Sequence, residues 1–111
     1  MTTFPVNALN TATTGQYINR TSTATSYVVA ATDYYIGVTS TSAARTITLL
    51  AAPLVNQVFV IKDESGAASI NNITVTVSGG SINIDGATTA LIYTNYGSIT
   101  VMFNGMQYFI I

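Results

Sequence analysis

From Tyr27 to the last residue, the sequence is a series of short runs of Val, Ile, Thr, Tyr and Phe. Gly, Asn, Asp or Pro interrupts these runs every eight to twelve positions. β-branched and aromatic residues favour strands, and the interrupting residues favour turns. No stretch keeps a helical period for three turns. The pattern therefore predicts an all-β domain of eight or nine short strands, either a compact antiparallel β-sandwich or a barrel-like domain.

Residues 1–26 have a different composition, and we interpret them as a linker or stalk segment that precedes the β-domain of residues 27–111. They are rich in Thr, Ser, Asn and Ala. Their apolar residues are isolated and stand at Phe4, Val6, Leu9, Tyr17 and Ile18. Apolar residues at such spacing cannot bury much surface by themselves. The segment is therefore expected to be either disordered or held by neighbouring chains.

The clearest single element is the C-terminal stretch SITVMFNGMQYFII, which predicts a β-hairpin. Asn104 and Gly105 form the dipeptide that best fits a two-residue type I′ turn, because both positions need a positive φ. This turn would pair Phe103 with Met106, Val101 with Tyr108, and Ile99 with Ile110. The opposite face would mix polar and apolar side chains: Ser98, Thr100, Met102, Gln107, Phe109 and Ile111. Such a face suits an interface between subunits.

Two further runs differ in the faces they would present. In QVFVIKD, Val58 and Val60 lie on one side of an extended chain and Phe59 and Ile61 on the other, so both sides are apolar. In NNITVTV, apolar residues alternate with threonine, which is the pattern of a strand with one face in water. The first strand is therefore expected to contact another subunit on one side, and the second to lie on the outside of the domain.

Charged side chains are scarce, so most of the surface must be neutral. Seven of the 111 residues are charged, which is 6%, and the formal net charge is −1; about 25% is usual in soluble domains. Three of the seven, Lys62, Asp63 and Glu64, stand together in the stretch IKDESG. We interpret this stretch as the end of a strand running into a surface loop with exposed charges. Because a nearly neutral surface gives little repulsion between copies, we expect other copies of the chain to cover part of it.

Composition also argues against several classes of partner and chemistry. Three cations, Arg20, Arg45 and Lys62, are too few to track a phosphate backbone, so no nucleic-acid partner is expected. The longest apolar runs, such as LLAAPLV, are short and contain proline, so no membrane insertion is expected. The first ten residues do not have the pattern of a signal peptide. No cysteine is present, so there is no disulfide framework.

The same composition predicts that the protein is not an enzyme and needs no cofactor or metal. Histidine and cysteine are absent, which removes most nucleophilic and transition-metal sites. A pair of carboxylates, as in glycoside hydrolysis, is the remaining option. The adjacent carboxylates Asp63 and Glu64 would point to opposite sides of an extended chain, and Asp85 with Gly86 has the chemistry of a turn. A calcium site at Asp63, Glu64 and Ser65 would need more oxygens at defined spacing.

Several motifs together resemble a module found near the C-terminus of phage tail fibres and of similar fibre-like proteins of other large DNA viruses. They are ATDYYIGV, TITLLAAP, KDESG, NNIT, IDGA, NYGS and the last hairpin, which ends in aromatic residues. The resemblance covers residues 27–111. This chain has Leu50 where the pattern usually has proline, and Tyr108 where the pattern often has tryptophan.

The resemblance implies a β-structured homotrimer at the distal end of a viral fibre, made in the host cytoplasm and located in the virion at the fibre or tail tip. The domain would hold three chains together, contact the host surface during attachment, or do both. The alternative is a purely structural trimerisation clamp, or an assembly module, without receptor binding.

Two sets of residues are candidates for these roles. The oligomer interface is predicted to include Phe59, Ile61, Met102, Phe109 and Ile111. A contact with a host cell-surface glycan or protein is predicted at Tyr93, Asn95, Tyr96, Asn71 and Asn72, because Tyr and Asn make adaptable binding surfaces. The alternative for the tyrosines is that they fill half-buried strand positions, and for the asparagines that they make turns or stack near a trimer axis.

Overall fold

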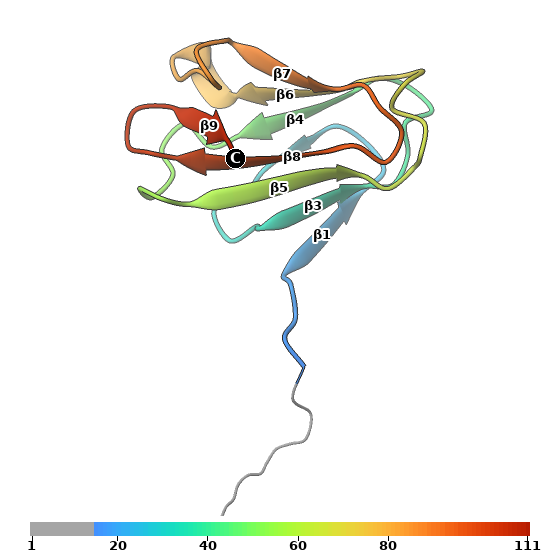
Figure 1. Cartoon of the computed structure of the whole chain (residues 1–111), viewed down its shortest axis with the longest axis horizontal. Helices are drawn as coiled ribbons and strands as arrows, with labels where there is room; N and C mark the ends of the chain where they lie inside the picture. Colours follow the sequence, from blue (N-terminus) through green and yellow to red (C-terminus); the bar gives the residue numbers. More distant parts are fainter. Residues whose placement is uncertain (1–14) are drawn as a thin grey trace, which may run out of the picture.

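The computed structural model describes residues 15–111, which form a sandwich of two β-sheets (Figure 1). The five-stranded sheet has the order β1 (Arg20–Thr23), β3 (Tyr35–Val38), β5 (Val58–Asp63), β8 (Ser98–Phe103) and β9 (Tyr108–Ile110). The four-stranded sheet has the order β2 (Tyr27–Val28), β4 (Arg45–Leu49), β6 (Ile73–Val77) and β7 (Thr89–Ile92). A short 3₁₀ turn, η1 (Ser78–Gly80), follows β6. The all-β prediction is confirmed for the described residues, and none of their helical turns is long and apolar enough to cross a membrane.

The predicted antiparallel arrangement is only partly right, because both sheets are mixed. From β1 to β6 the chain crosses to the other sheet after every strand, so successive strands of one sheet run in the same direction. β1, β3 and β5 are therefore parallel, and so are β2, β4 and β6. Antiparallel pairing begins only with β7, β8 and β9. Alternating apolar residues indicate strands, but they do not indicate strand direction.

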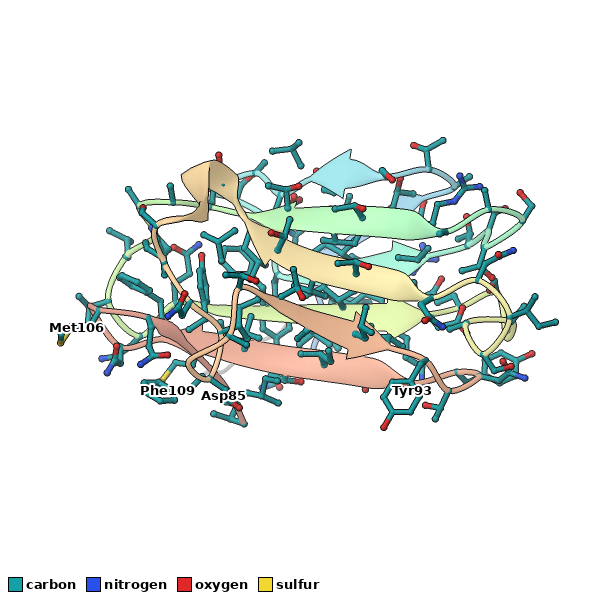
Figure 2. The ribbon with its side chains drawn as sticks, turned by 90° about the horizontal axis from the view of Figure 1, so that it is seen from above. Asp85, Tyr93, Met106 and Phe109 are labelled. Carbon is teal, nitrogen blue, oxygen red and sulfur yellow. The ribbon has the colours of Figure 1, made fainter. Side chains whose placement is uncertain are left out.

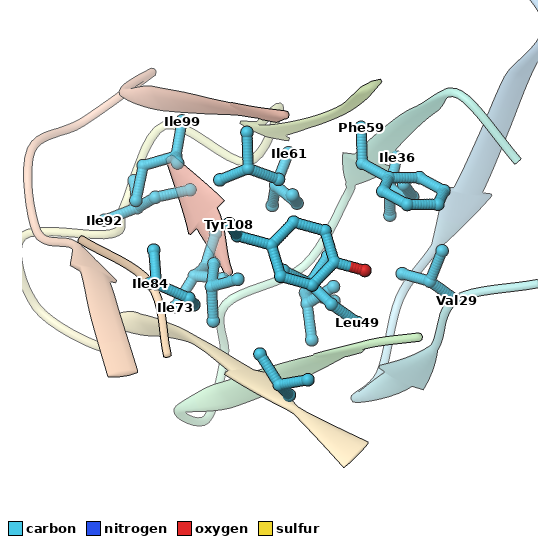
Figure 3. Packing of buried hydrophobic residues seen from close by; sticks show 14 of the residues in the cluster. Val29, Ile36, Leu49, Phe59, Ile61, Ile73, Ile84, Ile92, Ile99 and Tyr108 are labelled. Carbon is cyan, nitrogen blue, oxygen red and sulfur yellow. The ribbon is translucent and has the colours of Figure 1, made fainter. Parts of the chain in front are cut away.

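The core lies between the two sheets, and its largest members are Tyr108 and Phe59, both fully buried (Figure 3). The Tyr108 ring lies 5.4 Å from the Phe103 ring and 6.4 Å from the Phe59 ring. Its hydroxyl donates a hydrogen bond of 2.7 Å to the main-chain oxygen of Leu50. Burial raises the pKa of Tyr108 to about 12. A tyrosine can occupy this core position because its polar end has a partner.

Phe59 and Ile61 were predicted at the oligomer interface, and the structure shows that this prediction is wrong. Both side chains are fully buried between the sheets. Their alternate neighbours Val58, Val60 and Lys62 point to the outer face of the five-stranded sheet instead. QVFVIKD is apolar on both sides, so the sequence alone did not distinguish its inner side from its outer side. By contrast, β6 follows its prediction, because its apolar residues are buried and its threonines point outward.

The C-terminal hairpin is present, but its register differs from the prediction. Phe103 lies opposite Tyr108 rather than Met106. The Asn104 side-chain oxygen accepts hydrogen bonds from the main-chain N–H groups of Met106 (2.9 Å) and Gln107 (3.0 Å) and thereby closes a longer loop. The side-chain chemistry of asparagine therefore overrides the two-residue turn.

A turn of the type expected at the hairpin is found instead at Asp85 and Gly86. Both residues have positive φ, 49° and 79°. The flanking residues Ile84 and Ala87 exchange main-chain hydrogen bonds of 2.7 and 2.9 Å. The Asp85 carboxylate then accepts a hydrogen bond of 3.2 Å from the main-chain N–H of Ile110. This turn covers part of the free edge of β9, which protects the edge from pairing with other chains.

The sandwich begins earlier in the chain than residue 27. β1 lies inside the predicted linker and pairs with β3. Before it, residues 15–19 leave the domain (Figure 1), and the side chains of Tyr17 and Ile18 are 87% and 63% exposed. Asn19 fixes the exit, because its side chain donates to the main-chain oxygen of Thr32 (2.7 Å) and its own main-chain oxygen accepts from Tyr35 (3.2 Å). The rest of the predicted linker, residues 1–14, lies outside the described residues.

Candidate binding surfaces

Asp63 organises the loop that follows β5. Its carboxylate is fully buried and accepts five hydrogen bonds. The donors are the main-chain N–H groups of Ser65, Gly66, Ala68 and Tyr96 and the Ser65 hydroxyl, at 2.6–3.2 Å. Burial alone would raise the pKa of Asp63, but these donors hold it below its ordinary value. The prediction that the charges of IKDESG are exposed is therefore wrong for this residue.

The loop after β5 and the loop between β7 and β8 form one hydrogen-bonded unit. Besides the bond from Tyr96 to Asp63, the Lys62 ammonium donates to the main-chain oxygen of Tyr96. The Asn95 side-chain oxygen accepts from the main-chain N–H of Ser69 at 3.0 Å. The Tyr96 ring lies directly over Gly66, where any side chain would collide with it. Two motifs separated in the sequence, KDESG and NYG, therefore act as one structural element.

Glu64 lies across the outer face of the five-stranded sheet. It forms an ion pair with Arg20 of β1, whose Nε donates at 3.1 Å, and it accepts a hydrogen bond of 2.7 Å from the Tyr35 hydroxyl. The Arg20 guanidinium and the Tyr35 hydroxyl hold the pKa of Glu64 below its ordinary value. Gly37 makes room for this arrangement, because a side chain there would overlap the carboxylate. The pair therefore ties the strand that carries the N-terminal exit to the centre of the sheet.

The predicted receptor-binding residues all lie at one end of the sandwich, on the loops before β6 and before β8. Their amides are engaged in holding loops: Asn71 donates to the Thr41 oxygen (2.9 Å) and Asn72 to the Ala68 oxygen (2.7 Å). Tyr93 and Tyr96 nevertheless remain 65% and 62% exposed.

Ile70, 81% exposed, lies on the loop before β6 at the same end, and sequence reasoning did not single it out. The one sequence feature that could have indicated its exposure is that this apolar residue stands inside a polar turn. We call Ile70, Tyr93 and Tyr96 the tyrosine surface.

The outer face of the five-stranded sheet is apolar over much of its area. Its apolar and aromatic outward side chains, all partly exposed, are Tyr35, Val58, Val60, Met102 and Phe109. Its polar outward side chains include Lys62, Ser98 and Thr100. Met102 lies between Val58 on β5 and Phe109 on β9. Ile111 is 68% exposed and continues the face beyond β9, with its main-chain N–H bonded to Thr100. Of the five predicted interface residues, three therefore lie together on this surface, which we call the outer face.

The end of the sandwich opposite the tyrosine surface also exposes apolar side chains. Figure 2 shows Met106 and Tyr93 at opposite ends. Met106 is 82% exposed, and Leu54 and Val55 of the neighbouring loop are 78% and 61% exposed. Gln57 holds this loop, because its side chain accepts from Leu54 (2.9 Å) and donates to Ala31 (3.0 Å). Met106 was predicted only as the partner of Phe103 in the hairpin, and Leu54 and Val55 were not singled out from the sequence.

The remaining carboxylates are arranged for structure, and residues 15–111 contain no group of three acidic, histidine or cysteine side chains that could hold a metal ion together. Asp33 accepts hydrogen bonds from the hydroxyls of Thr21 and Tyr27, both 2.7 Å, and from the main-chain N–H of Ala30. Despite burial, which opposes the effect, these three donors lower the pKa of Asp33.

A scan against protein-family models and a search of curated proteins gave no match to this chain.

Proposed function

We propose that this chain is the C-terminal domain of a viral fibre, which holds three chains together and contacts the host surface. The resemblance in KDESG, NNIT and NYGS supports the fibre assignment. The observation that supports an oligomer best is the outer face, where Val58, Val60, Met102 and Phe109 are partly exposed side by side and Ile111 is exposed beyond them. In a monomer, the outward positions of a sheet are usually polar. Apolar residues here favour a surface that another chain covers.

The energetics favour association by apolar burial. Burying roughly 600 Å² of apolar surface per subunit would give about 15 kcal/mol of gross stabilisation at about 25 cal/mol per Å². Ordering and lost rotational freedom reduce this value considerably. The ion pair of Arg20 with Glu64 is formed within one chain, so it adds nothing to the contact between chains. A closed cyclic assembly of three is then the symmetry that the resemblance indicates.

The tyrosine surface is the part of the domain that we assign to host contact. Tyr93 and Tyr96 present exposed rings, and aromatic rings combine a large contact area with few rotatable bonds. The nearby ions are already engaged: Lys62 binds the Tyr96 oxygen, Asp63 is buried, and Arg45 binds the Ser40 oxygen at 2.9 Å. A neutral ligand, such as an uncharged glycan or a polar protein loop, suits this surface best.

A purely structural clamp is the second candidate, and one observation favours it. The amide groups of Asn71, Asn72 and Asn95 all hold loops of their own chain. These side chains therefore have less hydrogen-bonding capacity left for a ligand than their exposure in a loop suggests.

Light scattering of the purified chain tests the oligomer. The chain has a mass of 11.7 kDa, so a trimer has 3 × 11.7 = 35.1 kDa. Met102→Asp places a charge on the outer face and is expected to give monomers. Thr76→Asp places the same charge on the outer side of the four-stranded sheet and is the matched control, which should stay trimeric. A wild-type mass near 12 kDa at micromolar concentration would refute the oligomer.

Binding of the isolated trimer to host cells tests the host contact. Tyr93→Ser is expected to abolish adsorption while the mass stays at that of the trimer. Leu54→Ser, at the opposite end of the sandwich, is the control with a similarly exposed side chain and should adsorb normally. A wild-type trimer that does not adsorb would leave the structural clamp as the function.

A further inference from the structure

A hollow lies where the N-terminal exit meets the five-stranded sheet. Ile18, Arg20 and Tyr35 line it, and its walls are mainly apolar. Within the same chain, Glu64 forms an ion pair with Arg20 and also accepts a hydrogen bond from the Tyr35 hydroxyl. Arg20 and Tyr35 are therefore held in place by Glu64, which also balances the charge of Arg20.

An exposed aromatic side chain stands one residue before this hollow. Tyr17 is 87% exposed, so its ring does not fill the hollow of its own chain. Asn19 is anchored to Thr32 and Tyr35, which fixes the direction in which the chain leaves the sheet. The described segment of residues 15–19 leads into β1, so it enters the domain beside this hollow.

We propose that the segment Gly15–Asn19 of a second copy packs against this hollow and inserts the partner's Tyr17 between Ile18, Arg20 and Tyr35. This rests on the proposed function, because it requires a homo-oligomer. A ring of three needs two different, complementary patches on each subunit. The exposed Tyr17 and the hollow are such a pair, and Tyr17 lies on the segment that would run beside its counterparts in a fibre.

Two features favour a second copy as the occupant. First, the hollow is continuous with the outer face, because Tyr35 lies beside Val60 in the sheet and Val60 lies beside Thr100. The same neighbour could therefore cover both surfaces. Second, Glu64 binds the edge of the Arg20 guanidinium, through Nε and a terminal nitrogen. The flat face of a guanidinium held in this way can stack on an aromatic ring.

Cysteine cross-linking tests the proposal, because the chain has no cysteine of its own. The full-length Tyr17→Cys/Tyr35→Cys variant should, on oxidation, give a covalent trimer that reduction returns to monomers. The single Tyr17→Cys variant should give at most dimers. A Tyr17→Cys/Thr76→Cys variant places the second thiol on the other sheet and should not give the covalent trimer.

The outcomes distinguish a failure of the Tyr17 contact from a failure of the trimer. Light scattering that shows a trimer, with only monomer bands after oxidation of Tyr17→Cys/Tyr35→Cys, would overturn the Tyr17 contact and leave the trimer intact. A monomer by light scattering would overturn both. Equal cross-linking in the Thr76 control would also overturn the contact, because it would reflect random collision.

A variant without cysteine gives an independent measurement. Tyr17→Ala should raise the protein concentration at which the trimer dissociates by about tenfold. Gln16→Ala changes the exposed neighbour and should leave that concentration unchanged. Equal effects of the two substitutions would contradict the insertion of the Tyr17 ring.

Discussion

Removing the Asp63 carboxylate should destabilise the domain more than any other single change of charge. The carboxylate is fully buried and accepts four main-chain N–H groups and one hydroxyl. An unpaired buried donor costs about 1–3 kcal/mol. Water reaches some of the released groups in the Asp63→Ala variant, so a loss of about 4 kcal/mol in the free energy of unfolding is expected. That is a large part of the roughly 5–15 kcal/mol of a typical domain.

Asp63→Asn should lower the free energy of unfolding by about half as much, because the two carboxylate oxygens of Asp63 accept from different donors. Oδ1 accepts from Ser65 and Gly66, and Oδ2 accepts from Ala68 and Tyr96. An amide keeps one acceptor oxygen and turns an NH₂ group toward the other donors. One set of hydrogen bonds is therefore kept and the other is lost.

Urea unfolding followed by circular dichroism, at equal protein concentration, measures both losses. With a slope of about 1.5 kcal/mol per M, a loss of 4 kcal/mol lowers the midpoint by about 2–3 M. Asp85→Ala is the control, because its exposed carboxylate accepts one long bond from Ile110, and it should cost under about 1 kcal/mol. If Asp63→Ala costs no more than this control, the carboxylate does not organise the two loops.

Acid should destabilise the domain: the pKa values of Asp63, Asp33 and Glu64 lie below their ordinary 3.8, 3.8 and 4.5, so the unfolded chain gains protons first. The urea midpoint should therefore be constant above about pH 5 and fall between pH 4 and pH 2; an unchanged midpoint at pH 3 would contradict this. Gly37→Ala should displace the Glu64 carboxylate and lower the urea midpoint about as much as Glu64→Ala does. The double variant should be little less stable than either single variant, and a double-mutant cycle measures this. Tyr108→Phe should cost about 1–2 kcal/mol, because it leaves a main-chain oxygen of the β4–β5 loop unpaired, and a variant as stable as the wild type would refute that bond.

The strands could be predicted from the sequence because their signal is local. The alternation of Ile73, Val75 and Val77 with threonine gives both the strand and its buried face. The order and direction of the strands could not be predicted, because they depend on the chain crossing between sheets after each strand from β1 to β6. Arg20–Thr23 was assigned to the linker because RTST has no apolar pattern. It forms a strand by pairing with β3, which is a non-local contact.

The candidate sites were predictable to a similar extent. Met102, Phe109 and Ile111 were assigned to a surface, and they do lie on one. Phe59 and Ile61 were not separated from Val58 and Val60, because both sides of that strand are apolar. The contact of Tyr96 with Asp63 spans a long stretch of sequence, and no local pattern in a single chain indicates it.

The structure also explains how so few charges are used, and this gives a final prediction. Each of the seven charged side chains has a hydrogen-bonding partner in its own chain: Arg20 and Glu64 bind each other, and Asp33, Arg45, Lys62, Asp63 and Asp85 bind neutral groups. The charged side chains are therefore few, and each is already engaged within its own chain, so ion pairs between copies are not expected to dominate association. Because association would depend on apolar burial, raising NaCl from about 0.05 M to about 1 M should leave the mass in solution unchanged or strengthen the oligomer. Dissociation by salt would show instead that ion pairs between chains hold the assembly together.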